Sequence, residues 1–62
     1  MQVYYYCPEV DGLFYELGSC LVAAVSRAKY QQSDVDVYRL VEYEDGQQKS
    51  IYIATISPSK EL

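Results

Sequence analysis

The sequence predicts an α+β fold in which one helix packs on one face of a three-stranded antiparallel sheet. Three observations predict it. An aromatic and β-branched run opens the chain at residues 2–7, and an amphipathic stretch follows at 13–31. Two alternating runs, 34–44 and 47–57, then flank an Asp-Gly turn. We therefore expect a single domain with the element order β-α-β-β, spanning all 62 residues.

The first strand, residues 2–7, reads QVYYYC and ends at Pro8, which cannot donate to a sheet hydrogen bond. Side chains alternate across a strand, so Tyr4 and Tyr6 share one face and the odd-numbered residues share the other. Residues 8–12 are predicted to be the connection into the helix.

The helix, residues 13–31, is predicted from its apolar periodicity. At 100° per residue, one broad stripe collects the apolar residues Leu13, Phe14, Leu17, Cys20, Leu21, Ala24, Val25 and Ala28. Asp11 is the predicted N-cap, because its carboxylate can accept a first-turn N–H. Arg27 and Lys29 lie near the C-terminal end, where cations suit the helix dipole.

The hairpin has two candidate registers. A two-residue loop at the Asp-Gly step would pair Glu42 with Lys49, whereas a three-residue loop at 44–46 would pair Tyr43 with Gln47. We favour the second because it sorts the side chains by type. One face then holds Val35, Val37, Val41, Ile51 and Ile53. The other holds Tyr38, Leu40, Tyr52, Ala54 and Ile56.

Charge distribution suggests the strand order. Strand 34–44 carries most of the charged side chains, which suit a sheet edge, and strand 47–57 is the more apolar. We therefore expect the order 1-3-2, with strand 47–57 between strands 2–7 and 34–44. The alternative places 34–44 in the middle and contains one parallel pair. Residues 58–62 are predicted to be a frayed polar tail.

The sheet face away from the helix is predicted to be a partner or dimer interface. In the favoured register it holds Tyr4, Tyr6, Tyr38, Leu40, Tyr52 and Ile56. Such an aromatic patch is typical of a contact surface. In the other register the patch is instead Val35, Val37, Val41 and Tyr52. The competing interpretation is that tyrosines simply line a solvated sheet.

The residues that usually carry catalysis are missing. The chain has no histidine and no glycine-rich phosphate loop, so no nucleophilic triad can form within it. A possible acidic edge is formed by Asp34, Asp36, Glu42 and Glu44. Such pairs could bind a cation weakly but more often keep an edge strand soluble. We expect no catalytic residue, no metal site, no cofactor and no enzyme activity.

Two single residues give further expectations. Arg39 lies among core-facing valines, so we expect its stem to pack while its head reaches the rim, or else to anchor an acidic partner. Cys7 and Cys20 are expected to be reduced core thiols, because no secretory signal is present. A helix that starts at residue 13 would place Cys20 beside Tyr4 and not beside Cys7.

The net charge of −4 argues against a protein that binds nucleic-acid phosphates and favours a cytoplasmic protein, with no run long enough to cross a membrane. We predict a small acidic protein-interaction module that acts as a homodimer. One such protein would be a regulator or inhibitor encoded by a phage or mobile element, which binds a basic host protein. Two alternatives remain: an acidic nucleic-acid mimic, and a single-strand binder that stacks bases on tyrosines.

Overall fold

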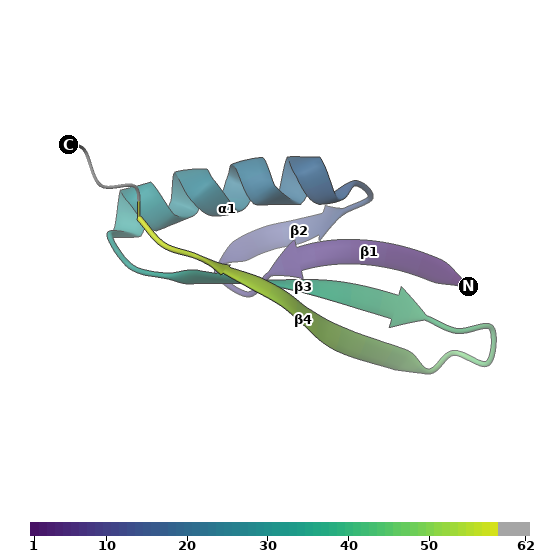
Figure 1. The fold of residues 1–62 in the computed structure, drawn as a ribbon. Helices are drawn as coiled ribbons and strands as arrows, with labels where there is room; N and C mark the ends of the chain where they lie inside the picture. The colour runs from purple at the N-terminus through teal and green to yellow at the C-terminus, as the bar shows by residue number, and fades with distance from the viewer. Residues whose placement is uncertain (59–62) are drawn as a thin grey trace.

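A computed structural model describes residues 1–58. Its elements are β1 (Gln2–Cys7), β2 (Val10–Phe14), α1 (Leu17–Gln31), β3 (Val35–Glu42) and β4 (Gln48–Ile56). The four strands form one antiparallel sheet in the order β2-β1-β3-β4, and the helix lies along one face of it (Figure 1). The predicted α+β class is confirmed, although the sheet has four strands where the sequence predicted three. The predicted tail lies outside the described residues except for its first residue.

The additional strand is β2, which was predicted to be a loop and the first turn of the helix. Pro8 and Glu9 form a tight turn, after which β2 runs back along β1 with Val10 opposite Cys7 and Phe14 opposite Tyr5. Phe14 packs against the core from this strand. The helix therefore starts four residues later than predicted, at Leu17.

The start of the helix also differs from the prediction. The N-cap residue is Glu16, and its side chain makes no capping hydrogen bond. Asp11, the predicted N-cap, lies inside β2, so that prediction was wrong. The helix ends at Gln31, and Gln32 takes the left-handed conformation (φ 57°) that often closes a helix.

The predicted strand order was wrong, because β3 and not β4 lies in the middle. The β1–β2 hairpin reverses the chain once more, so β3 returns antiparallel to β1 and pairs Tyr6 with Tyr38. The alternative order, with strand 34–44 in the middle, is confirmed, but its parallel pair is absent from the described residues for the same reason. Alternation also explains why a charged strand can be central: Val35 and Val37 are fully buried, while Asp36 between them points to the other face.

The favoured hairpin register is confirmed near the turn. The Tyr43 N–H donates to the Gln47 carbonyl at 2.8 Å, and the Gly46 N–H donates to the Tyr43 carbonyl at 3.0 Å. Gly46 has φ 88°, the conformation that the three-residue loop requires. Farther along, the register shifts between the Tyr38 and Val37 pairs.

This register shift is a β-bulge with consequences for the predicted faces. Beyond it, Val37 lies opposite Ala54 and Val35 lies opposite Ile56. Cross-strand partners share a face, so Ala54 and Ile56 lie on the helix side of the sheet. Ile56 packs against the core, and its predicted place on the outer face was wrong.

The core lies between α1 and the sheet and contains only small buried side chains. Its fully buried cluster consists of Cys7, Cys20, Ala24, Ala28, Val35 and Val37. Alanines on the inner helix face let the helix approach the sheet closely. Because no aromatic side chain is fully buried among the described residues, the core is small even for a chain of this length.

Candidate interaction surface

The outer face of the sheet, opposite α1, collects aromatic side chains from every part of the sheet. We define the tyrosine face as Tyr4, Tyr6, Tyr15, Tyr38 and Tyr52 together with Leu13 and Leu40. The tyrosines come from β1, β3, β4 and the residue that follows β2. The helix lies on the opposite side of the sheet (Figure 1), so it covers none of them.

Ring contacts link these tyrosines across the strands. Tyr6 stacks on Tyr38 with ring centroids 5.4 Å apart, and Tyr52 meets Tyr38 edge-on at 6.0 Å. Tyr4 and Tyr15 form a second, tilted pair at 5.4 Å. These separations lie in the range of favourable aromatic pairs. The result is a continuous row of rings across β1, β3 and β4, with a second pair toward β2.

Hydrogen bonds fix the positions of two of the ring hydroxyls. The Tyr6 hydroxyl lies 2.8 Å from the Ser50 hydroxyl. The Thr55 hydroxyl donates to Asp36 at 2.8 Å, and its oxygen lies 2.6 Å from the Tyr52 hydroxyl, which is therefore the donor to Thr55. Rings held in this way lose less side-chain entropy when a partner covers them.

The tyrosine face is neutral in its centre and acidic at its ends. Asp36 and Glu42 are the charged residues of β3 that share this face, and six residues of strand separate them by about 20 Å. Arg39 lies opposite Tyr5, and Lys49 lies opposite Val41. Because cross-strand partners share a face, both cations lie on the helix side of the sheet. None of the described residues on this face is a lysine or an arginine.

Most of the predicted interface residues come together on this face. Tyr4, Tyr6, Tyr38, Leu40 and Tyr52 lie on it as expected, whereas Ile56 does not. Two members, Leu13 and Tyr15, were not predicted to lie here, because the apolar periodicity assigned both to the helix. They are 53% and 78% exposed. The signal that could have located them is the Pro8-Glu9 turn between two alternating runs.

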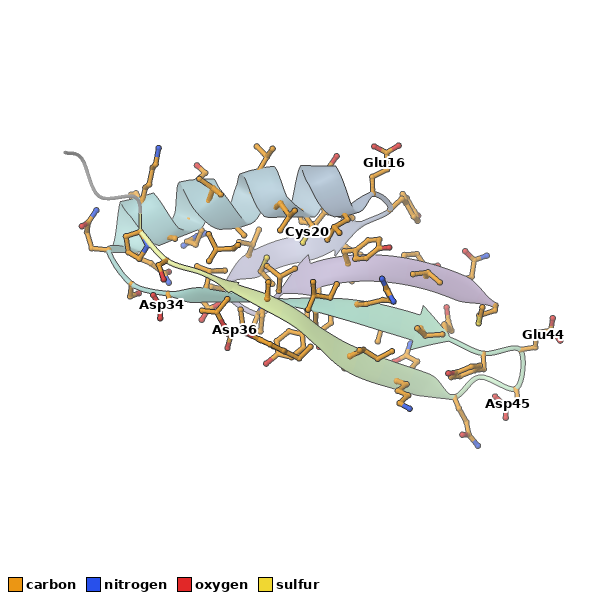
Figure 2. The ribbon with its side chains drawn as sticks, viewed as in Figure 1. Glu16, Cys20, Asp34, Asp36, Glu44 and Asp45 are labelled. Carbon is orange, nitrogen blue, oxygen red and sulfur yellow. The ribbon has the colours of Figure 1, made fainter. Side chains whose placement is uncertain are left out.

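The predicted acidic edge does not form, because β3 is a central strand. Asp36 lies on the side of the sheet away from the helix, and Asp34 and Glu44 lie toward opposite ends of the molecule (Figure 2). A Glu44 carboxylate oxygen is 4.0 Å from the terminal amine of Met1. Within residues 1–58, no group of three or more potential ligands is placed to hold a metal ion.

Arg39 lies on the helix side of the sheet, as its place among core-facing valines predicted. Its guanidinium carbon lies 5.8 Å from the centre of the Tyr5 ring on the helix side of the sheet. The Nε atom is buried and has no hydrogen-bond partner among the described residues. The contact with the Tyr5 ring therefore helps to hold this side chain in place.

The two cysteines lie side by side, contrary to the prediction. Their sulfur atoms are 3.6 Å apart, both side chains are buried, and both are free thiols. Cys20 points from α1 toward the sheet (Figure 2). The prediction failed because β2 first carries the chain back along β1, so that the helix starts beyond Tyr5 and runs toward the end of β1 that holds Cys7. Burial, then the hydrogen bond and charge of Cys20 and the charge of Glu9, raise the pKa of Cys7 to about 12.

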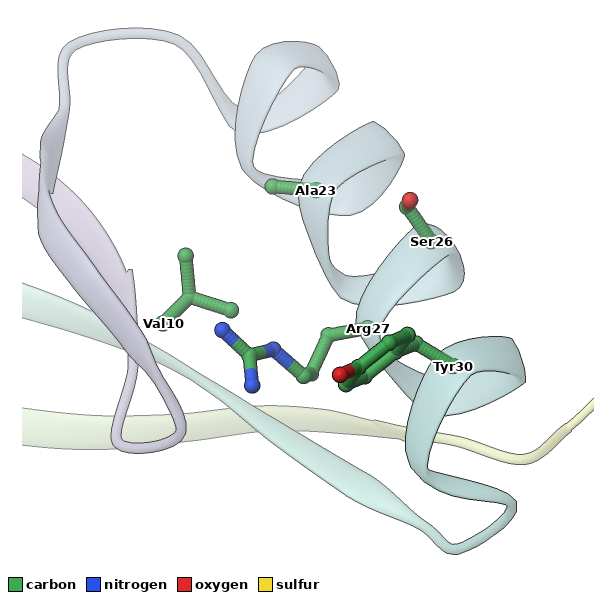
Figure 3. Close-up of a pocket in the computed structure, with 5 residues that line it drawn as sticks. All are labelled: Val10, Ala23, Ser26, Arg27 and Tyr30. Atoms are coloured by element: carbon green, nitrogen blue, oxygen red, sulfur yellow. The ribbon is translucent and has the colours of Figure 1, made fainter.

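A hollow of about 510 Å³ lies between α1 and β2 (Figure 3). Its lining residues are Val10, Ala23, Ser26, Arg27 and Tyr30. The Arg27 guanidinium lies between Val10 and the helix, 5.8 Å from the centre of the Tyr30 ring. The Tyr30 ring covers one side of the Arg27 guanidinium, and none of the other lining residues is charged.

The helix in residues 1–58 is too short to cross a membrane. No family model, curated protein or solved structure matches this chain, so the tyrosine face itself is the basis for a functional proposal.

Proposed function

We propose that this chain is a non-enzymatic protein-interaction module that acts as a homodimer, with two tyrosine faces packed against each other. One observation carries the proposal: five tyrosines in ring-to-ring contact lie on the sheet face that the helix leaves uncovered. Tyrosine supplies large contact area at low entropy cost, and it is enriched in protein interfaces.

The small core supports self-association. The fully buried cluster contains nothing larger than valine, and it fills only the space between the sheet and α1. A sheet with one solvated face leaves a chain of 62 residues with little buried apolar surface. A second copy on the outer face would bury the tyrosines and give the sheet a second packed layer.

The charge pattern also suits a second copy. Two like faces can meet only if their centres carry no net charge, and the centre of this face is formed by Tyr38, Leu40 and Tyr6. Asp36 and Glu42 lie toward its ends, where their carboxylates can stay in water at the rim of an interface.

The same pattern gives less support to the nucleic-acid alternatives. A single-strand binder needs cations beside its stacking rings, and no lysine or arginine is present among the described residues of this face. A nucleic-acid mimic needs carboxylates in a row, whereas Tyr38 and Leu40 separate Asp36 from Glu42.

The test is the molar mass in solution by light scattering across a concentration series. We expect a dimer for the wild-type chain and a monomer for the Tyr38→Ser plus Tyr52→Ser double variant. The matched control is Tyr30→Ser plus Tyr43→Ser, which removes two exposed tyrosines outside the tyrosine face and should remain a dimer. Circular dichroism checks that each variant is folded.

A folded wild-type monomer at high concentration would contradict the homodimer. The tyrosine face would then be free, and a basic protein would become the expected occupant because the face ends in carboxylates. A dimer that both double variants leave intact would place the interface elsewhere. Salt-sensitive binding of a labelled single-stranded oligonucleotide would favour the stacking alternative.

A further inference from the structure

The buried thiol pair is a feature that the tyrosine face does not explain. Cys7 is the last residue of β1, and Cys20 lies in the first turn of α1, thirteen positions along the chain. Their sulfur atoms are 3.6 Å apart, and the side chains are 1% and 0% exposed. The pair therefore lies at the contact between helix and sheet.

We propose that Cys7 and Cys20 form a reversible intramolecular disulfide, which ties the start of α1 to the end of β1 under oxidising conditions. The oxidant is a small-molecule disulfide such as oxidised glutathione. In two exchange steps the protein loses both S–H hydrogens and gains one S–S bond. The reagent's S–S bond breaks, and it leaves as two thiols that carry the two hydrogens and two electrons.

The geometry requires little movement. A disulfide bond is about 2.05 Å long, so the two sulfur atoms must approach by about 1.5 Å. They already face each other within one cluster, and the other buried members of that cluster are alanines and valines. Side-chain rotation together with a small shift of the first helical turn can bring the sulfurs together.

The first turn of α1 gives a route for reagent to reach the pair. Glu16 makes no side-chain capping bond, the first turn contains no acidic residue, and Gly18 lies within it. Each of these features weakens a helix start. Opening of this turn would expose Cys20 while the sheet stays intact, so exchange should be slow in the closed state and controlled by the opening.

The cross-link would have a large effect on this fold. It would close a loop of about fourteen residues and join the helix layer covalently to the sheet layer, whose shared core is small. By thermodynamic linkage, the folded state stabilises the disulfide relative to the dithiol by the same free energy by which the disulfide stabilises the folded state. Folding should therefore favour the disulfide over the dithiol by roughly 100-fold relative to the unfolded chain.

The experiment equilibrates the full chain with reduced and oxidised glutathione at several ratios, once in native buffer and once in urea. Acid quenching, alkylation and intact mass then give the fraction that has lost two hydrogens. We expect an equilibrium constant for the native chain roughly 100-fold above that in urea. The midpoint of thermal unfolding of the oxidised chain should lie roughly 10 °C or more above that of the reduced chain.

The single variants Cys7→Ser and Cys20→Ser are the matched controls, since each keeps one thiol and should yield only a mixed glutathione adduct. Three results would overturn the proposal. They are mixed adducts on the wild-type chain in place of the internal disulfide, cross-chain dimers on a non-reducing gel, and a native equilibrium constant no larger than the one in urea. Each native sample is equilibrated by refolding from urea, so that slow access of glutathione to the buried thiols cannot be mistaken for absence of the disulfide.

Discussion

Cys7 shows how one buried side chain makes stability depend on pH. Burial among apolar groups opposes the thiolate, so the pKa rises from its ordinary 9.0 to about 12. The folded chain therefore holds the thiol proton more tightly than the unfolded chain does. The stability that comes from this difference is fully present below about pH 9 and is lost as pH rises toward 12.

We expect the free energy of unfolding to fall between pH 9 and pH 11 by up to about 1.4 kcal/mol per pH unit from this thiol. Urea unfolding of the reduced chain at several pH values measures the slope. Cys7→Ala should reduce the slope by that amount, because every other titrating group is retained. Equal slopes in the two proteins would show that Cys7 ionises as easily in the folded state as in the unfolded one.

At the scale of elements, the sequence predicted the hairpin turn well and the N-terminal half poorly. Asp45-Gly46 signals a turn directly, because few residues besides glycine adopt the φ of 88° found at Gly46. Leu13 and Phe14 are different, since their positions fit both a helical stripe and an alternating strand. Only pairing with β1 decides between the two, and pairing is a tertiary contact that local periodicity does not contain.

The β-bulge of β4 was hidden for a related reason. The register near the turn was predictable from the loop, but the shift beyond Tyr38 accompanies a tertiary contact, since Ile53 and Ile56 both pack against the core beneath α1. That shift moved one predicted interface residue, Ile56, to the other face. The two predicted tyrosines of this hairpin, Tyr38 and Tyr52, lie between the turn and the shift, so their faces were predictable.

Two glycines allow a matched prediction about backbone conformation. Gly46→Ala should lower the free energy of unfolding by about 1–2 kcal/mol, because alanine is strained at positive φ. Gly18→Ala should raise it by about 0.5–1 kcal/mol, because this glycine is helical and an added Cβ would meet no atom within 4 Å. Urea denaturation measures both changes, and a loss of stability in Gly18→Ala would contradict the helical assignment.

For the whole molecule, the main feature is a sheet with one covered face. The composition already suggested that tyrosines would line an uncovered surface, because eight tyrosines in 62 residues exceed what a small core can bury. The strand order could not be predicted with the same success. Charge was taken to mark an edge strand, but the central strand β3 directs Asp36 and Glu42 to the outer face and keeps its valines in the core.

Self-association predicts that stability depends on protein concentration. For a folded dimer that dissociates as it unfolds, the midpoint of thermal unfolding should rise by about 3–5 °C for each tenfold increase in concentration. Calorimetry over two decades of concentration measures this slope. The Tyr38→Ser plus Tyr52→Ser variant should show no slope, whatever its own midpoint. A wild-type midpoint that is independent of concentration would contradict the dimer.

The edges of the sheet determine what kind of assembly can grow. Among residues 1–58, both outer strands, β2 and β4, have backbone groups on one side without a strand partner. The β2 edge is five residues long and contains Gly12 at φ 96°, while β4 carries Lys49 and the bulge. Short, irregular or charged edges resist templated strand addition. In the proposed dimer, growth through the tyrosine faces stops after two copies, so we expect concentrated solutions of this protein to form closed particles and not fibrils.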